Sequence, residues 1–180
     1  MAPIEMYEQA AQDAFAVASV VTAEQLDWPT PCSEWTVQDL LDHLTGGTQY
    51  LLSGIEGREP SPVADSDADT FKHGVQAVSA GLRQPGAMER FCRSPLGFDW
   101  PIAQAVMGTV MDLVVHTWDL ATAIQQPVTL NPELVGFCVA TFLPDMPERG
   151  RAAGIVGPAT AVADDATADI RLLAAMGRPV

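Results

Sequence analysis

The sequence predicts an all-α protein, a four-helix bundle with a small C-terminal helical appendage. Four long segments repeat apolar residues at the three-to-four-residue spacing of a helix that buries one face, and stretches with Pro and Gly separate them. The chain has 180 residues, 48% of them hydrophobic, which is enough for one domain with a sizeable core. We therefore expect a single domain over residues 1–180, with the bundle core over about residues 1–126 and the appendage over about residues 127–180.

The first two helices are expected on either side of a proline-containing link. A helix over about residues 4–21 carries apolar residues at helical spacing. The prolines in residues 27–35 exclude a helix from the link. The second helix begins near Thr36, where Asp39 three residues later approximates a capping box, and its apolar face continues to Ile55.

Two further helices complete the predicted bundle. The acidic, proline-containing residues 57–69 are expected to form a solvated connection that is long enough to cross the bundle. A third helix follows over about residues 70–82 and ends before Pro85 and Gly86. Residues 91–100 are expected to be a short turn or an extended piece, and the fourth helix covers about residues 101–124.

The appendage is expected to hold two short helices. Asn131, followed by Pro and Glu, is a typical N-cap for a helix that continues to Leu143. A final helix is expected near residues 167–176, with Gly177 as its C-cap. Residues 144–164 contain several Pro and Gly residues and are expected to be mostly irregular.

The composition argues against several partners and compartments. Nine basic and 23 acidic residues give a formal charge of −14, whereas nucleic-acid binding needs clustered positive charge and an anionic membrane repels an acidic protein. The N-terminus lacks the features of a signal peptide, and no apolar run reaches the roughly 20 residues that span a bilayer. Cys32, Cys92 and Cys138 are odd in number and far apart, as expected for reduced thiols. We expect a cytoplasmic protein with no nucleic-acid or membrane partner, and a homodimer is one assembly that the sequence permits.

A polar strip interrupts the most apolar predicted helix. Apolar residues cover most of the circumference of residues 106–124, so this helix is expected to be buried. Asp112, His116 and Asp119 are spaced i, i+4 and i+7 and therefore share one narrow strip. A buried carboxylate is costly unless it is paired or bound to a metal, and Asp112 and His116 are placed to bind one cation. Small residues on the same strip are expected to leave room for that ion and its ligand: Ala105, Gly108 and Ala123.

His43, near the apolar face of the second helix, is the third candidate ligand. Two imidazoles and one carboxylate suit a catalytic-type zinc site, and the same set admits Fe(II), Ni(II) or Mn(II). From spacing alone, His116 is as well explained by a core histidine that is hydrogen-bonded to Asp112 or to a backbone carbonyl. Asp119 is either a fourth ligand or, as we expect, an acceptor that orients a ligating histidine. Cys32, with no histidine near it in sequence, is expected to be a packed thiol rather than a nucleophile.

Three segments carry a resemblance to a known family. They are D-W-P-T-P-C-S-E-W-T-V-Q-D-L-L-D-H-L-T-G-G from residue 27, D-L-V-V-H-T-W-D-L-A from residue 112, and the ending A-D-I-R-L-L-A-A-M-G-R-P. As a set they resemble the DinB-like superfamily, and more closely its actinobacterial metal-binding branch akin to the N-terminal domain of mycothiol-dependent maleylpyruvate isomerase. The resemblance implies a four-helix bundle of up-down-down-up order with one divalent metal, commonly zinc, at His43, Asp112 and His116.

Two departures from the family pattern limit what carries over. The family position that matches Asp112 is often Glu, and the shorter arm of Asp can displace the ion or admit a water. The isomerase also has a separate C-terminal domain that contributes to catalysis, and this chain is expected to be too short to contain it. Isomerase activity on maleylpyruvate is therefore not expected to carry over.

The resulting functional hypothesis is a metal-dependent enzyme that activates a low-molecular-weight thiol, mycothiol or a similar one, for transfer or isomerisation of an electrophilic small molecule. The thiol rests on the family resemblance alone. Two alternatives stay open: a non-catalytic bundle that binds a metal or small ligand, and a bundle that has lost its site and acts through oligomerisation. The lack of an obvious general base or substrate-gripping arginine near the motifs keeps the first of these open, and the intact set of three candidate ligands argues against the second.

Overall fold

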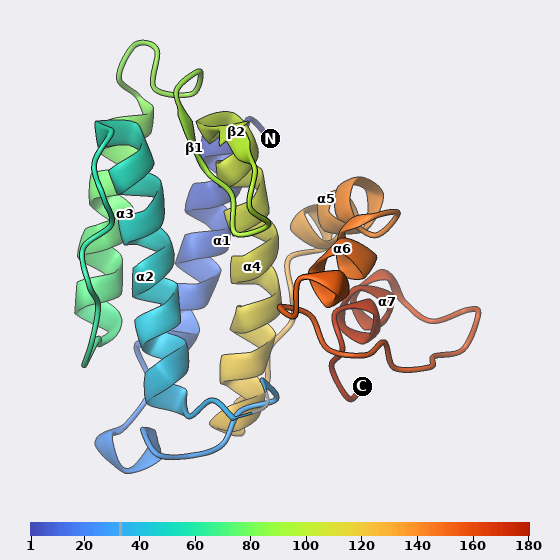
Figure 1. Ribbon diagram of the computed structural model, residues 1–180. Helices are drawn as coiled ribbons and strands as arrows, with labels where there is room; N and C mark the ends of the chain where they lie inside the picture. The colour runs from blue at the N-terminus through green and yellow to red at the C-terminus, as the bar shows by residue number, and fades with distance from the viewer. Residues whose placement is uncertain (33) are drawn as a thin grey trace.

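The computed structural model describes residues 1–32 and 34–180, and four long helices dominate it (Figure 1). Their sequence-predicted positions are correct to within a few residues. The helices are α1 (Pro3–Ala18), α2 (Val37–Glu56), α3 (Ala68–Leu82) and α4 (Ile102–Ala123).

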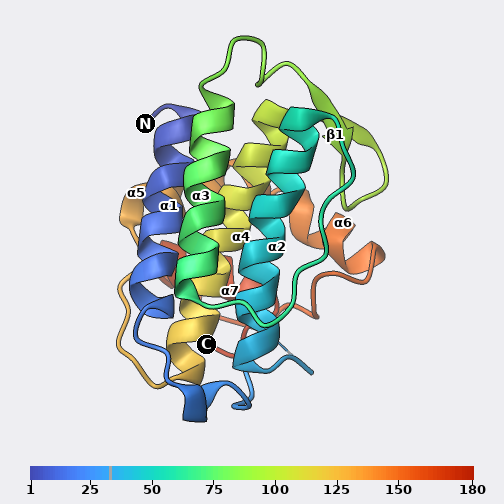
Figure 2. The ribbon, with the colours of Figure 1, turned by 90° about the vertical axis from the view of Figure 1, so that its left-hand side faces the viewer.

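The four helices form a bundle in which α1 and α4 run in one direction and α2 and α3 in the other (Figures 1 and 2). This is the up-down-down-up order that the family resemblance implied. The order requires a long connection between the parallel helices α2 and α3, and residues 57–67 run back along the outside of the bundle to provide it (Figure 2). The end of this connection is fixed to α2, because the Ser66 N–H donates to Asp42 Oδ1 at 2.7 Å and the Gln38 side chain donates to the Ser66 carbonyl at 2.9 Å.

The start of α2 is fixed by the capping box that the sequence predicted. The Thr36 N–H donates to Asp39 Oδ2 at 2.8 Å, and the Asp39 N–H donates to Thr36 Oγ1 at 3.2 Å. Each side chain thus satisfies a backbone donor that the first turn of a helix leaves free. The helix register that these bonds set determines which way His43 points in the second turn of α2.

The segment before α4 is a small hairpin. Strands β1 (Phe91–Arg93) and β2 (Asp99–Pro101) pair in antiparallel fashion, with Cys92 opposite Trp100. The sequence predicted a turn or an extended piece here, and the structure shows two short extended pieces joined by a turn. The Trp100 indole N–H donates to the Tyr50 hydroxyl at 2.7 Å, which ties the hairpin to α2.

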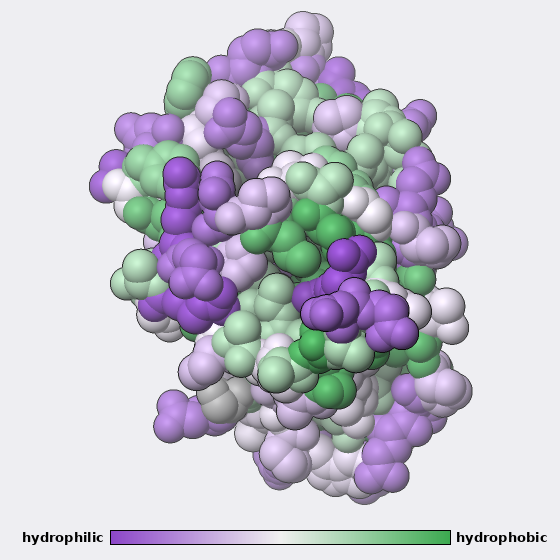
Figure 3. All heavy atoms as spheres, turned by 90° about the vertical axis from the view of Figure 1, so that its right-hand side faces the viewer, coloured by the Kyte–Doolittle hydropathy of each residue, from purple (hydrophilic) through white to green (hydrophobic). Residues whose placement is uncertain are grey.

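The appendage covers one side of α4 (Figure 1). It contains α5 (Pro132–Phe142), α6 (Met146–Ala152) and α7 (Ala168–Ala175). The Asn131 side chain caps α5 as predicted, by accepting from the Glu133 and Leu134 N–H groups at 3.0 and 3.3 Å. Hydrophobic side chains reach the surface near the middle of the face in Figure 3, between hydrophilic ones.

Residues 144–164 are mostly irregular, as predicted, but they include the helix α6, which the sequence did not predict. Pro147 lies in the first turn of α6, where its missing N–H costs nothing. Gly150 lets α6 pack closely on the following segment, because a Cβ at this position would lie 2.4 Å from the Val156 side chain. This helix depends on a packing partner that local sequence does not show.

The core of the bundle is built on α4, which packs against α1 and α2 on one side and α5 on the other. Most of its apolar side chains are buried, as the sequence predicted. Among the helices of residues 1–32 and 34–180, none is both long enough and apolar enough to cross a membrane.

Candidate metal centre

The first turns of α2 meet the last turns of α4, because the two helices are antiparallel. This brings the three predicted ligands together. His43 Nε2 lies 3.0 and 3.2 Å from the two carboxylate oxygens of Asp112, and His116 Nε2 lies 3.3 Å from Asp112 Oδ1. One ligand atom from each residue can be chosen so that all three lie within 4.8 Å of one another.

The three side chains differ in exposure. His116 is buried, whereas the side chains of His43 and Asp112 are 35% and 36% exposed. The expectation that Asp112 is buried is therefore wrong. Helical periodicity shows which residues share a face, but it does not show how deeply the neighbouring helix covers that face. The cluster opens to solvent on the side of His43 and Asp112.

The electrostatics of the cluster favour positive charge. The partial burial of Asp112 acts to raise its pKa, but the imidazoles of His43 and His116 outweigh this effect and hold that pKa well below the usual range. Burial acts to lower the pKa of His116, but the carboxylates of Asp112 and Asp119 raise it to about 9. Without a cation, His116 therefore holds a proton at neutral pH, in the place where a metal ion would compete with it.

Asp119 makes the contact that we expected of a residue that orients a ligand. It is fully buried, and its Oδ2 lies 2.8 Å from Nδ1 of His116. The same carboxylate accepts hydrogen bonds from Arg178, so Nδ1 of His116 is the donor in this contact and carries the hydrogen. Nε2 is then the nitrogen that faces Asp112.

Trp35 and Cys32, in the link before α2, also reach the site, and neither was predicted to do so. The Trp35 indole stacks on His116, with ring centroids 5.8 Å apart and an interplanar angle of 21°, and its centroid lies 4.8 Å from that of His43. Cys32 forms a second cluster with His116 and Asp119, again with ligand atoms within 4.8 Å of one another. The position of both residues just before the helix that carries His43 was the available signal.

Arg178 is a further residue of the site that was not predicted from the sequence. The sequence showed no arginine near the motifs, but the C-terminal tail brings Arg178 to Asp119, with Nε 3.0 Å from Oδ1. Its separation of 59 residues from Asp119 hid the contact. The quoted family ending contained this arginine, but its partner could not be inferred from one sequence.

The structure tests the predicted space beside the cluster at one of its three residues, Gly108. Gly108 was expected to leave room for a ligand, but a Cβ at this position would lie 3.0 Å from the Trp100 ring. Trp100 fills that part of the strip. By contrast, a Cβ at Gly46 or Gly47, one turn after His43, would have nothing within 4 Å. The open space therefore lies along α2.

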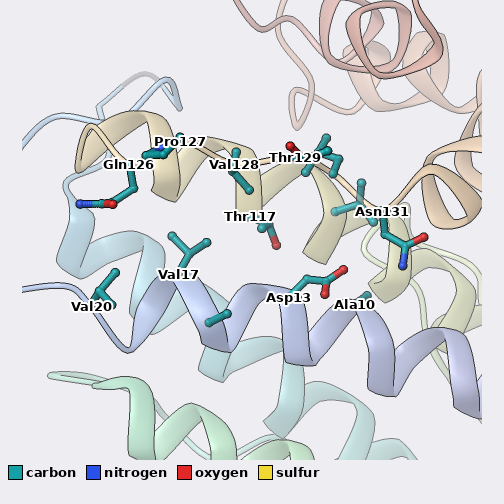
Figure 4. A pocket seen from close by; sticks show the side chains of 13 residues that line it. Ala10, Asp13, Val17, Val20, Thr117, Gln126, Pro127, Val128, Thr129 and Asn131 are labelled. Carbon is teal, nitrogen blue, oxygen red and sulfur yellow. The ribbon is translucent and has the colours of Figure 1, made fainter.

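A separate cavity of about 380 Å³ lies on another side of the bundle (Figure 4). It is bounded by α1, the end of α4 and residues 126–131. Asp13 and Thr117 line it together with apolar side chains such as Val17 and Val128 (Figure 4). The cavity is thus distinct from the cluster of His43, Asp112 and His116.

Comparisons with known proteins place the chain in a family. The family model described as the mycothiol maleylpyruvate isomerase N-terminal domain matches residues 7–87. This range includes His43 and ends before Asp112 and His116. Two relatives from Mycobacterium tuberculosis, uncharacterized protein Rv0738 of strain H37Rv and uncharacterized protein MT0763 of strain CDC 1551, are each 40% identical over 137 residues, which cover 72% of this chain and 71% of the relative.

Two solved structures share the fold. The crystal structure of mycothiol-dependent maleylpyruvate isomerase superposes with a TM-score of 0.64 at 13% identity, and that of a histidine-to-alanine mutant with a TM-score of 0.66 at 12% identity. Each match covers 87% of this chain and 72% of the isomerase chain, so it includes part of the appendage as well as the bundle. These structures show the fold, and the family model together with the two mycobacterial relatives shows that the chain belongs to the family of the mycothiol maleylpyruvate isomerase N-terminal domain.

Proposed function

We propose that this protein is a metal-dependent enzyme that uses a small-molecule thiol, mycothiol or a similar one. The thiol is either transferred to an electrophilic small molecule or used to isomerise it. The observation that carries the proposal is the convergence of His43, Asp112 and His116 at one solvent-accessible point. The thiol is supported by the family, whose structurally characterised relative is named as mycothiol-dependent. We also propose a cytoplasmic location, as the composition suggested.

The donor set fits one divalent cation. It offers two imidazole nitrogens and a carboxylate, which is the ligand chemistry of catalytic zinc sites and is also accepted by nickel, iron and manganese. Bonds of about 2.0–2.1 Å at the tetrahedral angle place neighbouring donor atoms about 3.3 Å apart. The separations of 3.0 Å from His43 to Asp112 and 3.3 Å from His116 to Asp112 are close to that value.

A cation bound there would supply an open coordination position and would lower the pKa of a thiol at that position. The protein contributes the rest. Asp119 keeps the hydrogen on Nδ1 of His116, so that Nε2 stays turned toward Asp112. Trp35 covers the imidazoles and limits water on its side. The open space along Gly46 and Gly47 gives the body of a thiol or substrate a place beside His43.

A cobalt titration tests this proposal. The protein is loaded with Co(II), a small thiol is added, and the near-ultraviolet spectrum is recorded as a function of pH. We expect a sulfur-to-cobalt charge-transfer band whose apparent pKa lies below the roughly 8.5 of a free thiol. Because the protein's own thiols can give the same band, the titration is repeated in a variant that lacks Cys32, Cys92 and Cys138.

Two results would overturn the proposal. Absence of the band in the cysteine-free variant, at saturating thiol and with cobalt still bound, leaves a protein that binds metal without activating a thiol. Full retention of metal by His116→Ala, shown to be helical by circular dichroism, removes the metal centre itself.

The second candidate is a non-catalytic metal-binding bundle. One observation favours it: the guanidinium of Arg178 is engaged by Asp119, so this cation is not free to hold an anionic substrate. A panel of electrophiles offered with a thiol separates the two candidates. Turnover that requires both the metal and the thiol supports the enzyme, and metal binding without turnover supports the alternative.

A further inference from the structure

The C-terminal tail is held in a fixed conformation on its way to the metal centre. Gly177 follows α7 with a φ of +86°, and a Cβ there would lie 3.0 Å from the backbone of Gly157, so both the turn and the close approach require glycine. The Arg178 N–H then donates to the Leu173 carbonyl at 2.9 Å, and Thr160 Oγ1 donates to the Arg178 carbonyl at 2.9 Å. The backbone of Arg178 is therefore anchored on both sides.

The guanidinium of Arg178 is buried and forms several hydrogen bonds. Nε donates to Asp119 Oδ1 at 3.0 Å and Nη2 donates to Oδ2 at 2.5 Å, a bidentate arrangement that fixes the plane of the carboxylate. Nη1 donates to the Met176 carbonyl at 2.7 Å, and Nη2 also contacts Cys32 Sγ at 3.3 Å. One side chain thus joins the tail, α4 and the link before α2.

A continuous path of hydrogen bonds leads from Arg178 to a metal-ligand candidate. Asp119 Oδ2, which accepts from Arg178, also accepts from Nδ1 of His116 at 2.8 Å. The direction of the carboxylate therefore sets the direction of the imidazole. Without Arg178, a fully buried carboxylate would keep His116 as a partner but would lose the group that fixes its plane.

We propose that Arg178 is a positioning residue of the metal centre, which acts through Asp119 to hold Nε2 of His116 toward Asp112 and His43. This inference rests on the proposed metal-binding function. It differs from a purely structural role, in which Arg178 fastens the tail to the bundle and the ligand geometry does not depend on it. Partners that orient a metal-ligating histidine typically change metal affinity by about 10–100-fold when they are removed.

The test measures Co(II) affinity, by competition with a chromophoric chelator, and the visible spectrum of the bound cobalt. Arg178→Gln should weaken affinity by about 10–100-fold and change the ligand-field bands. Arg178→Lys, which keeps the charge but not the fork, should give a smaller loss. Arg151→Ala is the matched control. The Arg151 side chain also holds the C-terminal region, by donating to the Ala175 carbonyl at 2.9 Å, but it does not bond to Asp119.

A double-mutant cycle tests the path through Asp119. In an Asp119→Asn background, Arg178→Gln should cause no further loss of cobalt affinity, since its effect passes through the carboxylate. The comparison of Asp119→Asn with the double variant remains possible if Arg178→Gln alone does not fold, because the double variant removes both buried charges together. Circular dichroism and thermal melting establish which variants are folded.

The outcomes separate the two proposals. Wild-type cobalt affinity and spectrum in Arg178→Gln overturn the positioning role and leave the metal centre standing. An equal loss of cobalt affinity in Arg151→Ala would also overturn the positioning role, because it would show that any loosening of the tail suffices. The same holds if Arg178→Gln weakens cobalt affinity as much in the Asp119→Asn background as in the wild-type chain. A wild-type chain that binds no cobalt overturns the proposed metal centre, and the role of Arg178 falls with it.

Discussion

Asp112 and Asp119 lie two turns apart on the same strip of α4, but their surroundings differ. Asp112 is 36% exposed and contacts two imidazoles, whereas Asp119 is fully buried and contacts one imidazole and a guanidinium. An imidazole can give up its proton to a metal, but a guanidinium keeps its charge at all physiological pH values. The difference supports the roles proposed above, in which Asp112 binds a cation and Asp119 orients His116.

The largest expected effect is on stability and separates the two carboxylates. Asp119→Ala leaves Arg178 buried without its carboxylate, and breaking a buried pair in this way costs about 3–5 kcal/mol. Asp112→Ala should cost less, because the Asp112 carboxylate is 36% exposed and water can partly replace it beside His43 and His116. Chemical denaturation of the metal-free proteins measures both free energies of unfolding. Equal losses would show that the contrast between the two positions is wrong.

The next effect concerns metal removal. Binding of a metal to the folded state stabilises it by mass action, about 2.7 kcal/mol when free metal is 100 times its Kd. A chelator should therefore lower the melting temperature of the wild-type protein. Asp112→Asn should melt at the same temperature with and without the chelator, because a ligand is missing. An unchanged wild-type melting temperature, with the metal shown to be gone, would mean that the site contributes little to the fold.

The same contrast shows how far the sequence alone could predict this molecule. The long helices and the caps at Thr36 and Asn131 follow from local patterns, and the structure confirms them. The encounter of His43 with Asp112 and His116 follows from an i, i+4 pair and a family motif. By contrast, α6 depends on the contact between Gly150 and Val156, which no local pattern shows.

The remaining parts of the site also depend on contacts between residues that are far apart in the sequence. The contact of Arg178 with Asp119 joins residues 59 positions apart, and the proximity of Cys32 to His116 depends on how the link folds over the bundle end. The exposure of Asp112 depends on how α2 covers α4. Sequence periodicity identifies which residues share a helix face, but burial along that face is set by neighbours that lie elsewhere in the chain.

A smaller effect is the release of a proton on metal binding. Burial opposes the charge on His116, but Asp112 and Asp119 raise its pKa to about 9 in the metal-free protein, so metal must displace a proton at neutral pH. We expect about one proton released per ion at neutral pH, falling toward zero above pH 9. Calorimetry in two buffers of different ionisation enthalpy measures this number. No release at neutral pH would contradict the raised pKa.

The raised pKa of His116 also determines how the stability of the metal-free protein changes with pH. The folded-state pKa of His116 lies above the unfolded value of 6.5, so the contribution of its charge is complete below pH 6.5 and is lost as the pH rises through about 9. Metal-free wild-type protein should therefore lose stability over this range. His116→Gln should lose less, because it has no imidazole to titrate.

The smallest expected effect tests whether the exposed side of Asp112 is the side that a ligand uses. Gly46 lies one turn after His43, and a Cβ there would meet nothing within 4 Å, so Gly46→Ala should stabilise α2 by about 0.5–1 kcal/mol. Gly54→Ala is the matched control in the same helix, because its Cβ would lie 2.7 Å from Ile102 Cδ1, and it should destabilise. If a thiol occupies the space along α2, Gly46→Ala should weaken thiol binding to the cobalt protein while cobalt affinity stays unchanged. Thiol binding that is unaffected by the added methyl group would place the thiol on another side of the cluster, and the open space along α2 would then have no part in the reaction.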